Sequence, residues 1–363
     1  MAATPAEIRL TTQVRQRRML GAFAGHPLVR AIAKALLTIW VTMTLTFFLI
    51  RLMPGSPVQL KIDELIQQSG GSMSYDEAAS IASGMFSIDL NAPLHEQYLS
   101  FIAHVARGDL GTSFLSTGTP VMGIILSVLP WTLFAVGTGL LLSFAAGVGL
   151  GLFGAYHRNS LFDRVVSTGG SLVSSIPNYL TALLILLVFG IQLRILPIAD
   201  MRGAFTPGIE PGFTPAFIGD ILFHASLPIG VFFLTTIGHW ILGMRSATLA
   251  ALEEDYVVAA RARGLPDGRI TTAYVGRNAA LPLVAEFAIS VGFIVGGAVV
   301  IEQIFVYQGI GLRLLKAIDA RDYPVMQGIL LILTASVVVA NLAADLLYSK
   351  LDPRIGRAGG SAG

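Results

Sequence analysis

Six long apolar runs, separated by polar segments, set the pattern of this chain. A helix crosses a hydrocarbon core of about 30 Å with about 20 residues, which each run supplies. The runs predict membrane spans at about residues 29–53, 121–156, 165–191, 221–242, 281–301 and 326–347. The second run exceeds the length of one span, so we expect it to tilt or to begin outside the membrane. The third is interrupted near Pro177. The pattern predicts an all-α polytopic membrane protein with six transmembrane helices.

The composition agrees with a membrane protein, because 54% of the 363 residues are hydrophobic and only 13% are charged. An average soluble domain carries about 25% charged residues. The net charge of +2 gives no support to nucleic-acid binding. The lack of cysteine excludes disulfides, iron–sulfur clusters and thiol nucleophiles. The first apolar run is too long for the core of a signal peptide and lacks a small-residue cleavage site, so we expect a retained span.

The distribution of lysine and arginine predicts the orientation of the spans, since loops rich in these residues stay in the cytoplasm. Sixteen of the 24 basic residues lie in the N-terminal segment and the start of the first span (Arg30 and Lys34), in the loops after the second and fourth spans, and in the tail. Both termini are therefore expected to be cytoplasmic. Apolar residues at helical spacing from Tyr98 to Val105 predict a packed cap outside the membrane. The predicted parts are a cytoplasmic N-terminal extension 1–28, a first span 29–53, an external, periplasmic-side segment 54–120, a core of spans two to six over 121–350 with a cytoplasmic loop at 245–280, and a cytoplasmic tail 351–363.

A polar stretch, residues 253–282, separates the fourth and fifth spans. Its first three residues are acidic, which suits the positive end of a helix dipole. Two arginines would lie in the last turn, followed by Gly264 in the C′ position and Pro266 just beyond, which is a typical helix stop. The spacing predicts a short helix over residues 253–264.

Several kinds of chemistry are missing from the sequence. No lysine follows a glycine, so the chain has no Gly-Lys-Ser/Thr phosphate loop, and another chain would have to bind any ATP. The lack of an HExxH pair and of a Cys/His cluster argues against a metal-dependent hydrolase. Asp109 lies in a Gly-Asp-Leu-Gly motif that superficially resembles an intramembrane aspartyl site, but it falls in the external segment without a second aspartate at its depth. We predict neither catalytic nor metal-binding residues.

Ionisable residues within or near the spans are candidates for function, because lipid penalises them. They are few: His239, Arg245, Glu286, Glu302 and Asp345. Glu286 would lie about one turn inside the fifth span, with either a structural or a pathway role. Glu302, near the other end of that span, would line a path or pin the outer loop. Asn178, in the third span, is a weaker pathway candidate.

Five segments together resemble one family of transport proteins, the permeases of ABC importers. The likeness is to their oligopeptide/dipeptide/nickel branch and to its first, B-type, subunit. The segments that carry it are residues 47–57, 97–113, 255–282, 302–328 and 345–354. Two positions depart from the family pattern: Val258 stands where the namesake glutamate of the EAA loop would be, and Glu286 where a small or apolar residue is usual.

The resemblance implies a type I ABC importer architecture, in which the 253–264 helix is a coupling helix docked on an ATPase subunit. The residues expected to make this contact are Asp255, Tyr256, Ala260, Arg261, Arg263 and Gly264. The charged members would give charge complementarity. Tyr256 and Ala260, one turn apart, would give an apolar contact, and Gly264 would allow a close turn and a close approach.

The resemblance also implies partners. They are a paralogous permease that forms a heterodimer with this chain, two ATPase subunits that bind ATP and magnesium, and an extracytoplasmic substrate-binding protein. This chain itself would hold no cofactor. Segments 54–120 and 302–325 would either meet the binding protein or only cap the bundle. The assembly would lie in a prokaryotic plasma (inner) membrane as a multi-pass complex.

The substrate expected from the resemblance is a di- or oligopeptide, and Asn178, Glu286 and Glu302 are the candidates for pathway or gating residues. Other interpretations stay open at this stage. The same scaffold could import nickel, an oligosaccharide or another small solute. Two interpretations from other classes are a membrane enzyme, for which we find no catalytic groups at matched depth, and a structural anchor subunit, which would not need a capped loop helix.

Overall fold

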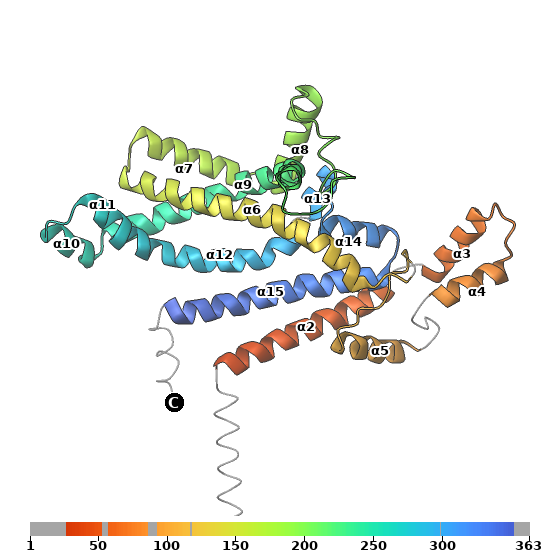
Figure 1. The fold of residues 1–363 in the computed structure, drawn as a ribbon. Coiled ribbons are helices and arrows are strands. Elements are labelled where there is room, and N and C mark those ends of the chain that lie inside the picture. Colours follow the sequence, from red (N-terminus) through yellow and green to blue (C-terminus); the bar gives the residue numbers. More distant parts are fainter. Residues whose placement is uncertain (1–26, 53–56, 86–92, 117, 298, 352–363) are drawn as a thin grey trace, which may run out of the picture.

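The computed structural model describes residues 27–52, 57–85, 93–116, 118–297 and 299–351 (Figure 1). Every regular element in these residues is a helix, apart from a single bridge between Thr112 and Pro120. This confirms the predicted all-α class. The predicted extension 1–28 and tail 351–363 lie almost entirely outside the described residues.

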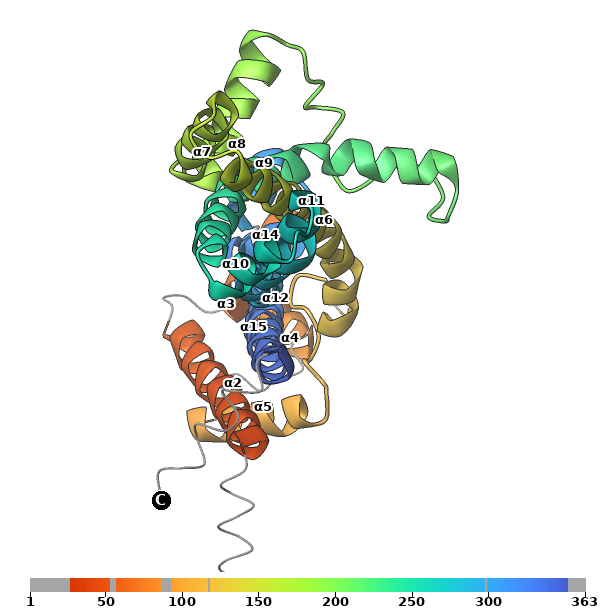
Figure 2. The ribbon, with the colours of Figure 1, turned by 90° about the vertical axis from the view of Figure 1, so that its left-hand side faces the viewer.

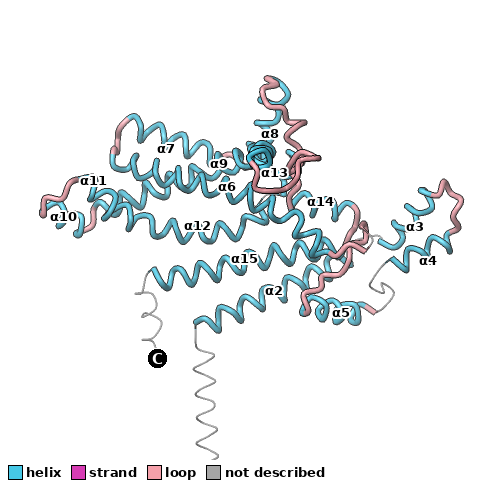
Figure 3. The backbone as a smooth tube through the Cα atoms, viewed as in Figure 1, coloured by secondary structure: helices cyan, strands magenta, loops and turns pink. Residues whose placement is uncertain are grey.

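Long helices form the body of the molecule. They are α2 (Pro27–Arg51), α6 (Val121–Tyr156), α7 (Leu161–Ser174), α9 (Pro215–Leu252), α12 (Arg277–Gly297) and α15 (Tyr323–Leu351). The two ribbon views show them stacked from α7, through α6 and α9, to α12, α15 and α2 (Figures 1 and 2). Short helices and loops gather at the ends of this stack (Figure 3). We refer to its two ends as the α10 end and the α14 end.

Four helical stretches in the described chain are long and apolar enough to cross a membrane: 29–50, 121–156, 215–252 and 323–344. They correspond to the predicted first, second, fourth and sixth spans. The predicted fifth span, about 281–301, falls on α12 and on α13 (Val299–Phe305). The count of six spans and the orientation of the termini remain predictions.

The predicted third span is not one straight helix. Its break lies where the sequence places it, between α7 and α8 (Asn178–Ile185), but the two halves meet at 96°. Pro177 is the N-cap of α8, and it lacks the N–H that a continuous helix would need. Beyond α8 the chain forms a π-helical turn, η1 (Leu186–Gln192). The third span is therefore corrected to a bent pair of helices.

Glycines let α6 and α9 lie against each other. A Cβ at Gly147 would stand 2.5 Å from Cβ of Trp240, and one at Gly151 would stand 2.5 Å from the carbonyl oxygen of Ile241. A side chain at either position would therefore clash with the backbone or the first side-chain atom of α9. Since real Cβ contacts are longer, only glycine allows this helix separation. The two helices therefore lie in close contact at Gly147 and Gly151.

Smaller helices pack at the α14 end and beside it. They are α3 (Pro57–Gln68), α4 (Tyr75–Met85), α5 (Leu94–Ala106), α13 and α14 (Ile310–Asp319). Helix α5 confirms the helix predicted from Tyr98 to Val105. The Tyr98 ring packs against Phe47 and Phe48 of α2, with ring centroids 5.3 and 5.6 Å away. Buried Asp322, just before α15, accepts hydrogen bonds from the Ser113 hydroxyl and from the Phe114 N–H.

Candidate functional site

A short helix, α10 (Asp255–Ala262), projects at one end of the bundle between α9 and α12 (Figure 1). The remaining link to α12 consists of α11 (Asp267–Arg269) and the π-helical η2 (Ile270–Gly276). The prediction of three acids in the first turn of α10 is wrong, because α9 runs on to Leu252. Glu253 is the C-cap of α9, Glu254 is the N-cap of α10, and only Asp255 lies in the first turn.

The predicted end of this helix is confirmed. Gly264 has a φ of +73°, the left-handed region that favours glycine. Its N–H donates to the Arg261 carbonyl at 2.9 Å, and the Leu265 N–H donates to the Ala260 carbonyl at 3.3 Å. This pair of bonds is a Schellman motif, which satisfies carbonyls that the last turn leaves open. A Cβ on Gly264 would meet nothing within 4 Å, so the chain itself needs glycine here for its backbone conformation.

One face of α10 is buried in its own chain. Val257 is fully buried, Ala260 is 3% exposed, and both belong to the core that contains Met244 and Ile270. Tyr256 packs against the same core and is half-buried. The expectation that Tyr256 and Ala260 form an apolar contact surface is therefore corrected: Ala260 faces inward and presents no such surface.

The opposite face of α10 is exposed and mostly charged. Asp255, Arg261 and Arg263 are all exposed, and their expected contact with a partner stays a prediction. The large apolar side chain on this face is Val258, which is 60% exposed. The exposed surface of α10 and its C-cap Arg263 thus combines one acid and two arginines with Val258 and two alanines, Ala259 and Ala262.

A polar cavity of about 640 Å³ opens beside α10. Glu253, Arg261 and Asp267 line it from the loop, and Tyr156 and Arg158 line it from the end of α6. Both signs of charge are present in its wall. The α10 end of the bundle therefore offers a charged hollow next to a rigidly capped helix.

Helix α9 is tied to α7 close to this hollow. Arg245 donates from Nε to Oδ1 of Asp163 at 2.6 Å and from Nη2 to Oδ2 at 3.0 Å. Asp163 is buried and also accepts from the Asn159 N–H and the Ser167 hydroxyl. Ser160 caps α7 by accepting from the Asp163 N–H. Such a bidentate pair fixes geometry as well as charge. No signal in the sequence paired these two residues.

Glu302 lies at the α14 end and pins the loop there. It is 1% exposed, and its carboxylate accepts from the Thr132 hydroxyl at 2.6 Å and from the N–H groups of Gly311 and Leu312 at 2.8 and 3.0 Å. Thr132 also accepts from the Ile310 N–H at 2.8 Å. The first N–H groups of α14 are thus satisfied by α13 and α6. Two roles were expected for Glu302, lining a path or pinning the outer loop, and these contacts favour pinning the loop.

Tyr307, in the loop beside Glu302, completes this cluster. It is fully buried, and its hydroxyl donates to the Trp131 carbonyl at 3.2 Å. Burial, with a smaller contribution from the Glu302 charge, raises the pKa of the Tyr307 phenol above its usual range. The phenol therefore stays protonated and keeps its role as a donor.

A second candidate site lies along the middle of the bundle. Nε2 of His239, on α9, lies 2.9 Å from Oε1 of Glu286, on α12. Beside this pair is a cavity of about 620 Å³, open on one side. Its wall is formed by Val136, Leu140, Ser174, Phe232, Thr235, Thr236, His239, Trp240, Leu242, Gly243, Ser290 and Ile294. Sequence reasoning named both ionisable residues but did not pair them. Asn178 begins α8, is half-buried and does not line this cavity.

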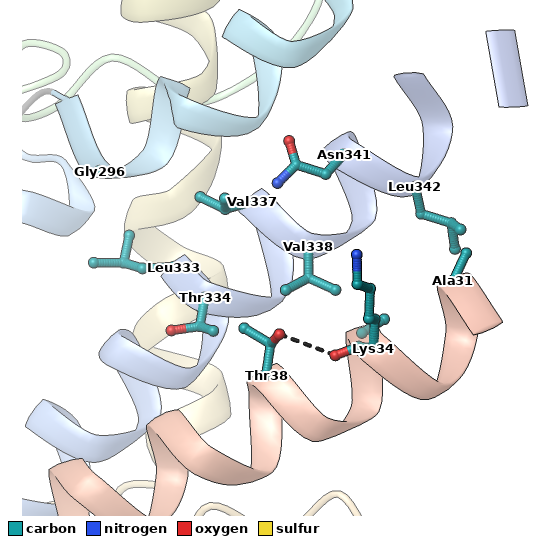
Figure 4. Close-up of a pocket in the computed structure, with 11 residues that line it drawn as sticks. Ala31, Lys34, Thr38, Gly296, Leu333, Thr334, Val337, Val338, Asn341 and Leu342 are labelled. Carbon is teal, nitrogen blue, oxygen red and sulfur yellow. Dashed lines mark hydrogen bonds between the residues drawn. The ribbon is translucent and has the colours of Figure 1, made fainter. Parts of the chain in front are cut away.

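A further cavity, of about 500 Å³, lies between α2 and α15 (Figure 4). Lys34 reaches from α2 toward Asn341 of α15, and Thr38 and Thr334 lie on either side of the gap. The Thr38 hydroxyl donates to the Lys34 carbonyl at 2.9 Å. A partly polar crevice thus opens between α2 and α15 along the stretch of α2 from Ala31 to Thr38.

Comparison with known proteins assigns the chain to a protein family. Residues 147–357, from the middle of α6 past the end of α15, match the profile described as binding-protein-dependent transport system inner membrane component. The chain belongs to this family. The matched region includes α10, the His239–Glu286 pair and Glu302, so all three features lie in the part of the chain that the family shares.

Relatives extend the likeness over most of the chain. A protein of Brucella suis named as a peptide permease is 36% identical over 86% of this chain and 92% of its own length. The oligopeptide transport system permease protein AppB of Bacillus subtilis is 31% identical, over 86% and 93%. The di/tripeptide transport system permease protein DppB of Pseudomonas aeruginosa is 33% identical, also over 86% and 93%. The resemblance seen in the sequence is confirmed.

Proposed function

We propose that this chain is a permease subunit of an ATP-driven importer that moves di- and oligopeptides across the plasma membrane. The observation that carries the proposal is the alignment of 86% of the chain with permeases named for oligopeptide and di/tripeptide transport. In this proposal the chain has six spans, a type I architecture and both termini in the cytoplasm. It performs no catalysis, because its partners hydrolyse ATP.

Helix α10 is the element that would receive force from an ATPase subunit. Its exposed face offers Asp255, Val258, Arg261 and Arg263 to a partner. Its buried face, through Val257 and Ala260, belongs to the same core as α9, η2 and α12. A push on α10 would therefore move α9 and α12 with it, since close-packed interiors transmit displacement rather than absorb it. Such a shift biases an equilibrium between two states of the permease.

The remaining partners follow from the same proposal. Two ATPase subunits bind ATP and magnesium, a paralogous permease completes the membrane unit, and a substrate-binding protein delivers the peptide on the external side. The small helices α3 to α5 and the α13–α14 region lie at the opposite end from α10 (Figure 1). They are the surface that the binding protein would meet.

Co-purification and transport together test this function. The tagged chain, expressed together with a second permease, two ATPase subunits and a binding protein of this family, should bring down the ATPase pair and the second permease. In proteoliposomes, that complex with its binding protein should take up a labelled tripeptide only when ATP is supplied. Uptake of nickel or an oligosaccharide in place of peptide would assign another substrate to the same scaffold. An active monomer that takes up solute without ATP would contradict the proposal.

A further inference from the structure

The His239–Glu286 pair lies within the predicted membrane spans, near their α10 ends. His239 precedes the end of the predicted fourth span, at about residue 242, by three residues, and Glu286 follows the start of the predicted fifth span, at about residue 281, by five. At 1.5 Å per residue these positions are about 5 and 8 Å inside the spans. Both are therefore about one helical turn inside the edge of a hydrocarbon core of about 30 Å.

Both side chains are also open at this depth. The side chain of His239 is 56% exposed and that of Glu286 is 49% exposed, so this chain does not enclose them. Ionisable groups are costly against lipid, and in membrane proteins they face a bundle interior or a water-filled cavity. The face of α9 and α12 that carries the pair is thus the face turned away from lipid.

The adjoining cavity has the make-up of a small-molecule site, with mostly apolar walls and a few polar groups. Its volume of about 620 Å³ is in the range of small-molecule sites. Hydroxyl groups of Thr235, Thr236 and Ser290 line it together with the ring of Phe232. Thr235 donates to the Val231 carbonyl at 2.8 Å, and Ser290 donates to the Glu286 carbonyl at 2.9 Å. Because their protons are used within their own helices, these hydroxyl oxygens remain available as acceptors.

We propose that this cavity is a binding station for a peptide in transit, and that the Glu286 carboxylate, which lies beside the cavity against the lining residue His239, holds the α-ammonium group of the peptide. The proposal rests on the peptide-import function. An ionised carboxylate only accepts hydrogen bonds, and in the free site Nε2–H of His239 supplies one donor. An ammonium supplies three donors and a full charge, so it can replace the imidazole as the partner of Glu286.

The charges favour the amino end of a peptide over its carboxyl end. A carboxylate bound to His239 would have to remove that ring from Glu286. It would then leave two negative groups side by side at low dielectric, which is unfavourable. The amino end of a peptide would instead meet the Glu286 carboxylate and the hydroxyl acceptors of the cavity. The station therefore selects for a cation at the leading or trailing end of the substrate.

The His239–Glu286 hydrogen bond could instead serve only to hold α9 and α12 together, and this structural role predicts a different result from peptide binding. A purely structural hydrogen bond is lost equally when either residue is replaced. The contact with the peptide is lost only when Glu286 is replaced, because His239→Gln leaves the carboxylate in place. Comparison of Glu286→Gln with His239→Gln therefore separates the two roles.

The experiment uses the purified complete complex in nanodiscs without binding protein, so that the binding protein cannot select the substrate. The probes are a tripeptide with a central benzoylphenylalanine and its N-acetylated form, crosslinked by light over a range of concentrations. In the wild type, the free-amine probe should label α9 or α12 at tenfold or more lower concentration than the acetylated probe. Glu286→Gln should remove that difference, while His239→Gln and the control Glu210→Gln, in an exposed loop, should keep it.

Equal effects of Glu286→Gln and His239→Gln on the labelling by both probes would overturn the peptide-binding role in favour of a purely structural hydrogen bond. An unchanged preference for the free-amine probe in Glu286→Gln would also overturn the peptide-binding role. The basal ATPase rate of each variant shows whether its complex is assembled. A failure of the import function is recognised separately, because the wild-type complex would then show no ATP-dependent peptide uptake with its binding protein. The two ideas thus fail in different assays.

Discussion

Replacing Gly264 by valine perturbs the turn that ends α10 without creating a clash inside the chain. The backbone there has a φ of +73°, and a left-handed conformation costs an L-residue about 1–2 kcal/mol. A Cβ at this position would meet nothing within 4 Å, so no steric cost is added. A loss of this size lowers the equilibrium constant for forming the native turn by about 5–30-fold but leaves the bundle folded.

The measurement is substrate-stimulated ATP hydrolysis by the assembled complex. We expect Gly264→Val to reach the membrane at the wild-type level and to keep its apparent Tm, because the Asp163–Arg245 tie and the α6–α9 contact are untouched. Stimulated hydrolysis and peptide uptake should fall by about 5–30-fold, because Arg263 and the exposed face of α10 are no longer held in the position that docks on the ATPase.

Two control variants sharpen this test. Gly264→Asn should retain more activity than Gly264→Val, because asparagine tolerates the left-handed region. Gly208→Val introduces the same backbone strain at a φ of +98°, also with open space around the Cβ, far along the chain from α10. It should leave hydrolysis unchanged. Wild-type coupling in Gly264→Val would refute the assignment of α10 as the contact with the ATPase.

Three further predictions concern the other contacts. Arg245→Ala should lower stability by about 2–3 kcal/mol in thermal unfolding, because it leaves buried Asp163 unpaired, whereas Arg158→Ala on the exposed turn should have little effect. Glu302→Ala should cost about 3 kcal/mol or more by leaving two buried N–H groups of α14 unsatisfied, and Glu302→Gln should cost less; equal melting temperatures would contradict the pinning role. Val258→Ser should weaken co-purification of the ATPase by about 5–10-fold, from about 1 kcal/mol of lost apolar contact, without a change in Tm.

Local signals in the sequence predicted much of the helical layout. Apolar runs located the long helices, because lipid and core both select such runs over about 20 residues. The left-handed end of α10 could be read from Gly264, since few other residues adopt that backbone at low cost. Pro177 marked the break between α7 and α8 for a similar reason, as it removes one backbone donor.

Features set by packing escaped prediction. The 96° angle between α7 and α8 depends on how both helices pack, which no single residue encodes. Ala260 was assigned to the partner-facing side of α10, because helical periodicity groups residues by face but does not say which face turns toward η2. His239 and Glu286 are 47 positions apart and on different helices, so their contact could not be inferred from one chain without its fold.

The glycine contacts between α6 and α9 give α9 a fulcrum. Trp240, which touches Gly147, lies 12 residues from the end of α9, so the arm from the fulcrum to the α10 end is about 18 Å. A rotation of about 10° around that point would move the α10 end by about 3 Å. His239 is the neighbour of Trp240, and it would hardly move. A peptide held beside the fulcrum could therefore stay in place while the access on either side of it changes.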